Sequence, residues 1–209
     1  MSTRIVKFDK LPTLRALYTN GTLKAAASPR YPSVASYLDR VSLFQGDITE
    51  LEVDAIVNAA NRGLLGLYIF DYAIHRAAGS GLKNECSKFP LIRSGTRCET
   101  GDAKITGAHD LPSQRVIHAV GPVYDSTDVD TVARQLASCY GKSLQLTVDN
   151  LQKQVSFPSI STGIYGYPIE DATHIALNET RRFLDSENSS RLDLVVFTVF
   201  SNKDREVYE

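Results

Sequence analysis

The stretch that decides the fold is Val53-Asp54-Ala55-Ile56-Val57-Asn58-Ala59-Ala60-Asn61. Its segment Asp54–Asn58 is a near-continuous apolar run, which is typical of a strand that is buried on both faces of a sheet. Asn58 and Asn61 stand where this run stops. Since α/β sheets usually bind their ligands at the carboxyl ends of parallel strands, the stretch predicts both a parallel sheet and a polar site at its edge.

Strand and helix patterns alternate on both sides of this run. Strands are predicted at Val41–Gln45, Asp54–Asn58, Ala103–Thr106, Arg115–Ala119, Gln154–Phe157 and Leu192–Phe200. Helical spacing predicts helices at Leu11–Tyr18, Tyr72–Ala78, Gly81–Phe89, Thr131–Asp149 and Ile169–Asp185, with a last helical turn at Lys203–Tyr208. This alternation favours an α/β fold, a three-layer α/β/α sandwich with a central mixed, largely parallel sheet.

The first forty residues differ from the rest of the chain. A short helical pattern stops at Asn20-Gly21, and Ser28-Pro29 with Tyr31-Pro32 forms a turn-rich connector. We therefore expect residues 1–40 to be an N-terminal helical extension packed on a single domain that spans residues 41–209.

Composition narrows the class of protein. A net charge of −1 gives no basic field, so direct nucleic-acid binding is not expected. No apolar run is long enough to cross a membrane, and a soluble chain is expected. Three cysteines without CxxC spacing favour neither a disulfide framework nor a zinc knuckle. We expect an intracellular protein, cytoplasmic or nuclear; a mitochondrial address is also compatible, since no acid precedes Asp9.

Two polar loops follow predicted strands. The amides of Asn58 and Asn61 can hold a ribose hydroxyl or a phosphate, although an asparagine at such a position more often caps a turn. Ser159–Gly166 is rich in small residues and precedes a helix, so its backbone N–H groups can converge on an anion. Taken singly, each loop is weak evidence, because an ordinary glycine-rich turn has the same composition.

Six ordered segments resemble the macrodomain family, in its MacroD-type branch, across Val41–Glu209. They are Gln45–Thr49, Val53–Asn61, Asp71–Gly79, Thr100–Thr106, Val116–Pro122 and Phe157–Gly166. The resemblance implies the macrodomain sandwich and a site for ADP-ribose. It also implies hydrolysis of the ester between ADP-ribose and aspartate or glutamate side chains, and deacetylation of O-acetyl-ADP-ribose. No metal or other cofactor is implied, and the partner is ADP-ribose or an ADP-ribosylated protein.

The resemblance also assigns roles to single residues. It implies that Asn61 contacts the proximal ribose and that Asp71 activates water or positions that ribose. The implied ligand-binding residues are Asp47, Ile48, Asn58, Gly66, Ser161, Thr162, Gly163, Ile164, Tyr165, Gly166 and Phe200. Among them Asp47 and Ile48 would read adenine, Tyr165 would cover the pyrophosphate, and Phe200 would lie against adenine.

Several of these residues have an ordinary structural alternative. Asp47 could be a turn acid, and Asp71 could simply stabilise the first turn of a helix. Tyr165 could be a packed aromatic, and Phe200 could belong to the core. Asp71 and His75 are four residues apart and could pair on one helix face.

The histidines and cysteines are expected to be structural. The four histidines, His75, His109, His118 and His174, do not have the spacing of a metal site. Cys86 and Cys139 are expected to be buried on helices, and Cys98 is expected at the surface.

The segment Gly66-Leu67-Tyr68-Ile69-Phe70 departs from the family, which has a run of glycines and a valine here. Glycines let such a loop reach positive φ and approach phosphates, and bulky residues do neither well. We expect weaker ADP-ribose binding and still weaker hydrolysis. The first function hypothesis is a mono-ADP-ribosyl hydrolase, expected as a monomer. The second is a non-catalytic or weakened ADP-ribose reader, and the third is an interaction module that uses the apolar loop.

Overall fold

The protein is built around a six-stranded sheet, seen in a computed structural model that describes residues 4–29, 31–66 and 69–209, with only the backbone of 69–72. The strand order is β2 (Val41–Gln45), β8 (Leu194–Val199), β7 (Gln154–Phe157), β4 (Ala55–Ala59), β6 (Arg115–Ala119) and β5 (Ala103–Gly107). The first five strands are parallel, and β5 runs antiparallel to β6. The predicted mixed, largely parallel sheet is therefore confirmed, and the carboxyl ends of the parallel strands share one edge.

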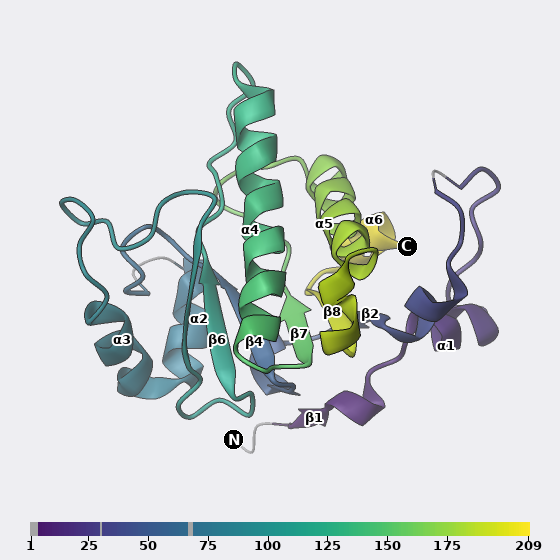
Figure 1. Cartoon of the computed structure of the whole chain (residues 1–209), viewed down its shortest axis with the longest axis horizontal. Coiled ribbons are helices and arrows are strands. Elements are labelled where there is room, and N and C mark those ends of the chain that lie inside the picture. The colour runs from purple at the N-terminus through teal and green to yellow at the C-terminus, as the bar shows by residue number, and fades with distance from the viewer. Residues whose placement is uncertain (1–3, 30, 67–68) are drawn as a thin grey trace.

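Helices cover both faces of the sheet (Figure 1). The helices α2 (Ile69–Ala77) and α3 (Gly79–Ser87) lie on one face, and α4 (Val129–Asp149) and α5 (Ile169–Leu184) lie on the other. Alternate residues of β4 divide between the two layers: Val57 packs toward α4 and α5, and Ile56 packs toward α2 and α3. Burial on both faces explains why this strand is an unbroken apolar run in the sequence.

The boundary between α2 and α3 is set by a glycine. Gly79 has φ of 72°, and a Cβ there would lie 2.3 Å from Asp110 Oδ2. The predicted stop at Gly79 is confirmed, but both helices begin earlier than their predicted starts at Tyr72 and Gly81.

The N-terminal residues lie across the domain. The helix α1 (Leu14–Thr19) begins after Thr13, whose side chain accepts a hydrogen bond from the Ala16 N–H. It begins later than predicted because Leu11 precedes a proline and is extended. A two-residue strand, β1 (Val6–Lys7), pairs with β3 (Leu51–Glu52), and this ladder was not predicted.

The extension contributes apolar side chains to the core. Leu11, Leu17 and Leu23 are buried in it, and Thr13 forms a β-bridge with Ser42 of β2. The division into residues 1–40 and 41–209 stays a prediction. Among the described residues, no helix combines the length and apolar character that crossing a membrane requires.

Candidate functional site

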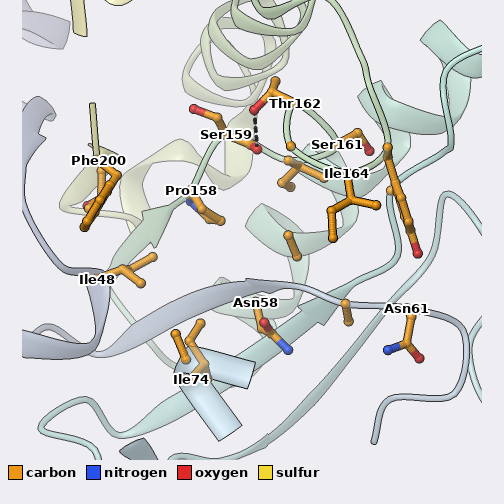
Figure 2. A pocket seen from close by; sticks show the side chains of 18 of the residues that line it. Ile48, Asn58, Asn61, Ile74, Pro158, Ser159, Ser161, Thr162, Ile164 and Phe200 are labelled. Atoms are coloured by element: carbon orange, nitrogen blue, oxygen red, sulfur yellow. Dashed lines mark hydrogen bonds between the residues drawn. The ribbon is translucent and has the colours of Figure 1, made fainter. Parts of the chain in front are cut away.

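A cavity of about 820 Å³ opens where the carboxyl ends of the parallel strands meet (Figure 2). Its walls come from two main segments, Asn58–Gly63 after β4 and Pro158–Tyr165 after β7. The remaining wall residues are Gly46, Asp47, Ile48, Ala73, Ile74, Gly121, Thr198, Phe200 and Asp204. This volume lies in the range of pockets that enclose a small-molecule ligand or cofactor.

The loop Ser159–Gly166 is held by a hydrogen bond to Tyr140 of α4 and by one within the loop itself. The Ile160 N–H donates to the Tyr140 hydroxyl at 3.3 Å, and Thr162 Oγ1 donates to the Ser159 carbonyl at 3.0 Å. Among the described residues, the backbone N–H groups of Gly163 and Ile164 donate to no other backbone carbonyl. Because both residues line the cavity, an anion bound there could accept hydrogen bonds from these N–H groups.

Ser161 has the most unusual backbone of this loop. Its φ of 67° is rare for a residue other than glycine, and such a conformation costs about 1–3 kcal/mol. Its side chain is buried, and Oγ makes no hydrogen bond within the described part of the chain. Gly121 approaches so closely that a Cβ there would lie 2.1 Å from this Oγ. A strained, buried hydroxyl in a cavity wall is a feature expected of a ligand-binding loop.

The first loop is closed by its own side chains. Asn61 Oδ1 accepts a hydrogen bond from the Gly63 N–H at 2.8 Å, so the turn-capping alternative for Asn61 is realised. Asn61 lines the cavity as well, and the two roles coexist. The neighbouring Arg62 carbonyl accepts hydrogen bonds from the N–H groups of Arg97 and Cys98, which fixes this loop against residues 96–98.

Position 66 requires a glycine because of its backbone conformation and because His75 lies close to it. Its φ is 68°, and a Cβ would lie 2.6 Å from His75 Cγ. Gly66 and Gly166 are the two described residues of the predicted ligand-binding set that do not line the cavity. The altered segment contains Leu67 and Tyr68, which lie outside the described residues. The side chain of Asp71 lies outside them too, and its backbone is in the first turn of α2.

Ile48 and Phe200 lie at the end of the cavity away from Asn61 (Figure 2), and Asp47, which precedes Ile48, lines the cavity as well. Asp47 Oδ1 accepts from both the N–H and the hydroxyl of Thr49, so the turn-acid role is present alongside its place in the wall. Phe200 follows the end of β8 and is 81% exposed. The alternative that Phe200 belongs to the core is therefore wrong, and an aromatic face stands beside the cavity.

Sequence reasoning assigned no role to Gly121, Thr198 or Asp204, which also line the cavity. Gly121 could have been found, since it follows a predicted strand and the structure needs a residue without a side chain there. Asp204 lies in α6 (Asn202–Tyr208), whose first turn is capped by Ser201. No spacing in the sequence relates that helix to the two loops.

A second polar cluster lies beside the cavity floor. His75, Cys86 and His118 bring their ligand atoms within 4.8 Å of one another. Sequence spacing did not predict this group, because its members come from α2, α3 and β6. All three side chains are of types that bind metals, but His118 is already engaged by Asn58 and Thr106. The amide Nδ2 of Asn58 donates to Nδ1, so the imidazole proton sits on Nε2, which then offers no lone pair to an ion.

The three cysteines are all buried and free. This confirms the expectation for Cys86 and Cys139, whereas the expectation of a surface Cys98 is wrong. Cys98 is enclosed because its N–H is bonded to the Arg62 carbonyl, which draws the segment inward. Burial raises the pKa of Cys98 and of Cys139 to about 12, so both remain protonated at neutral pH.

Comparison with known proteins decides the family. The profile of the macro domain matches residues 57–176, a range that contains both cavity loops. The chain belongs to the macro domain family. The resemblance of the six ordered segments is thereby confirmed, and the fold is that of a macro domain.

Relatives place this macro domain in the MacroD-type branch. It is 41% identical to rat ADP-ribose glycohydrolase MACROD1 over 204 residues, which cover 98% of this chain and 76% of the relative. It is 43% identical to Xenopus laevis ADP-ribose glycohydrolase MACROD2, covering 98% of this chain and 47% of that protein. For mouse MACROD1 the covered share is 60%, so the chain spans only part of several relatives.

The fold also matches solved macro domains. A Trypanosoma brucei macrodomain in complex with ADP-ribose superposes with a TM-score of 0.79 at 35% identity, covering 98% of this chain and 75% of that one. The likeness shows a common fold.

Proposed function

We propose that this macro domain binds ADP-ribose in the cavity and hydrolyses the ester that joins it to aspartate or glutamate side chains. The same chemistry would remove the acetyl group of O-acetyl-ADP-ribose. The observation that carries the proposal is the loop Ser159–Gly166, which lines the cavity with the strained Ser161 and with N–H groups that donate to no backbone carbonyl among the described residues. The MACROD relatives are named ADP-ribose glycohydrolases, which supports hydrolysis at ADP-ribose, and the ester linkage and the deacetylation are what the family resemblance implies.

The ligand would lie along the length of the cavity. Adenine would lie against Phe200, with Asp47 accepting from its exocyclic amine and Ile48 donating a backbone N–H. The diphosphate would lie over the Ser159–Gly166 loop, covered by Tyr165. This orientation places the proximal ribose beside Asn61, at the other end of the cavity from Phe200.

Hydrolysis would need a water molecule beside the anomeric or acyl carbon. Asp71 is assigned to orient that water and accept its proton. We expect Asp71→Asn to lower kcat about 10²- to 10⁴-fold, the contribution of a positioned general base, while ADP-ribose affinity changes far less.

A second candidate is a macro domain that binds ADP-ribose without hydrolysing it. It is favoured by Leu67-Tyr68-Ile69, which stand where the family has glycines.

We further propose that the chain acts as a monomer inside the cell, without nucleic-acid or membrane partners.

Two measurements separate the candidates. Isothermal titration with ADP-ribose compares this chain with a variant in which Leu67, Tyr68 and Ile69 are all changed to Gly, and a gel assay follows release from a glutamate-linked, automodified protein. We expect the glycine variant to bind and hydrolyse better. Equal affinity and rate in the two chains would refute the effect of the loop, and binding without release in both would establish the reader.

A further inference from the structure

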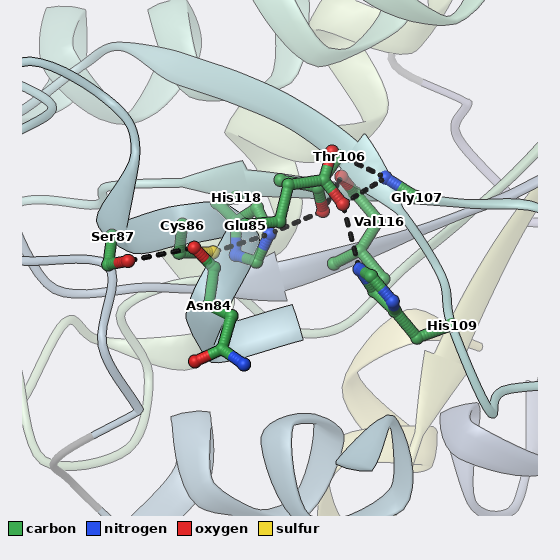
Figure 3. A network of polar contacts seen from close by, with 9 residues as sticks. All are labelled: Asn84, Glu85, Cys86, Ser87, Thr106, Gly107, His109, Val116 and His118. Carbon is green, nitrogen blue, oxygen red and sulfur yellow. Dashed lines mark hydrogen bonds and ion pairs between the residues drawn. The ribbon is translucent and has the colours of Figure 1, made fainter. Parts of the chain in front are cut away.

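A chain of buried polar side chains crosses three neighbouring strands beside the cavity floor. Asn58 on β4 faces His118 on β6, its register partner. His118 in turn contacts Thr106 on β5 (Figure 3). All three side chains are at most 2% exposed. Among the three, Asn58 is the one that lines the cavity. The other two lie behind it, outside the reach of a ligand.

The hydrogen bonds have a defined direction. The Val116 carbonyl can only accept, so the Thr106 hydroxyl donates to it and the Thr106 oxygen accepts from Nε2 of His118. Nδ1 of His118, which lies 3.2 Å from Nδ2 of Asn58, is then left as the acceptor. The neutral imidazole then has its proton on Nε2, which lies 3.0 Å from Thr106 Oγ1. The Thr106 hydroxyl in turn points to the Val116 carbonyl at 3.5 Å. The sequence of donors thus ends at a carbonyl that is fixed in the sheet.

The surroundings hold this chain in place. Cys86 Sγ lies 3.5 Å from His118 Nε2 and packs against the same atom from α3. The carboxylate of Glu85, the preceding residue, accepts from the Gly107 N–H at 3.2 Å and contacts His109 Nε2 at 2.7 Å. These contacts tie α3 to the end of β5, next to Thr106 (Figure 3).

We propose that His118 is a positioning residue that holds the carboxamide of Asn58 in one orientation at the cavity. The two edges of a carboxamide have opposite hydrogen-bonding character, and a half-turn about the Cβ–Cγ bond exchanges them. An imidazole fixed as the Nε2–H tautomer permits one of the two orientations. The inference rests on the proposed function, because Asn58 matters for catalysis only if ADP-ribose occupies the cavity.

A purely structural role would have different consequences. Loss of a buried hydrogen bond lowers stability wherever it lies in the fold. Loss of the orientation of Asn58 would in addition lower kcat and ADP-ribose affinity in a protein that is still folded. Thr106 separates the two roles well, since it touches neither Asn58 nor the cavity.

The test uses five variants of the whole chain. Kinetics of release from the glutamate-linked protein, titration with ADP-ribose and thermal unfolding are compared for His118→Leu, His118→Asn, Thr106→Val, Thr106→Ser and Thr147→Val. Thr147 is a matched control because its buried hydroxyl bonds to the Ser143 carbonyl within α4. In His118→Asn the side-chain oxygen can take the place of Nδ1 as acceptor.

We expect His118→Leu to lower kcat about 10- to 100-fold, as for a misplaced active-site group, and His118→Asn to recover part of that loss. Thr106→Val should reduce kcat and Thr106→Ser should restore it, while Thr147→Val should lower the Tm alone. Two-bond ¹H–¹⁵N spectra of the imidazoles should assign the Nε2–H tautomer to His118.

Other results would overturn the proposal. The proposal would be wrong if Thr106→Val kept the kcat and ADP-ribose affinity of the parent chain. It would also be wrong if His118 carried its proton on Nδ1, and both results can be obtained even if His118→Leu does not fold. If the parent chain neither binds nor hydrolyses, the proposed function fails instead, and the tautomer alone then decides whether His118 orients Asn58.

Discussion

Two loops border the cavity: the first is residues 58–66 after β4, and the second is Ser159–Gly166 after β7. Both contain residues with a left-handed backbone, but the contacts that surround those residues differ. In the first loop, Leu64 has φ of 59° and its side chain is fully buried, and Gly66 is packed against His75. In the second loop, Ser161 has φ of 67° and a buried hydroxyl without a hydrogen bond among the described residues. The strain of the first loop is matched by packing within the protein. Ser161 is packed as well, but its hydroxyl makes no hydrogen bond among the described residues, which is where a ligand would contribute.

The comparison predicts that replacing a glycine by alanine lowers the free energy of unfolding more in the first loop than in the second. We expect Gly66→Ala to lower the free energy of unfolding by about 2–4 kcal/mol, the sum of a left-handed alanine and overpacking against His75. Gly166→Ala is the matched control, because its φ is 67° but nothing lies within 4 Å of the added Cβ. It should cost about 1–2 kcal/mol from the backbone alone. Equal losses in urea unfolding would contradict the comparison.

The contact between Gly121 and the second loop can be tested in the same way. Gly121→Ala would place a methyl group against Ser161 Oγ and Ile160, and overpacking of this kind costs about 1–3 kcal/mol. We also expect ADP-ribose affinity to fall about tenfold, because the loop must move away from the cavity. Gly141→Ala in α4 is the control, with its nearest neighbour at 3.7 Å, an ordinary contact. Unchanged affinity in Gly121→Ala would mean that the loop need not keep this position.

The smallest expected effect has opposite signs for stability and binding. Ser161→Gly should raise the free energy of unfolding by up to about 1 kcal/mol, because glycine adopts a positive φ without strain. It should also weaken ADP-ribose binding several-fold through the lost hydroxyl, about 1 kcal/mol. Ser161→Ala removes the hydroxyl and keeps the strain, so thermal unfolding and titration of both variants separate the two effects. A stability loss in Ser161→Gly would place the strain elsewhere.

The sequence alone predicted most of the fold, for a physical reason. Strands such as Asp54–Asn58 are buried on both faces and can therefore be recognised as apolar runs in the sequence. Gly79 marks a helix end because its backbone is left-handed. Helix starts were less well predicted, as Leu11–Tyr18 shows, since a proline and a threonine cap shift the start to Leu14.

Parts of the candidate site could not be predicted, because they depend on tertiary contacts. The approach of Gly121 to Ser161 and the meeting of Asn58 with His118 join residues that are 40 and 60 positions apart. The exposure of Phe200 and the burial of Cys98 likewise depend on where neighbouring segments pack. The roles of Asp71 and Asn61 came from the family resemblance, and they remain proposals for the assays above.

One contact of the N-terminal segment bears on how the protein behaves in concentrated solution. β2 is an outer strand of the sheet, and unprotected outer strands invite pairing between molecules. Thr13 bridges to Ser42 there, and the Ser42 hydroxyl donates to the Pro12 carbonyl. Proline and a bridge of single-residue length prevent this segment from offering a regular edge of its own. We therefore expect this segment to limit edge-to-edge pairing at β2, so that a chain shortened to residues 41–209 aggregates more readily.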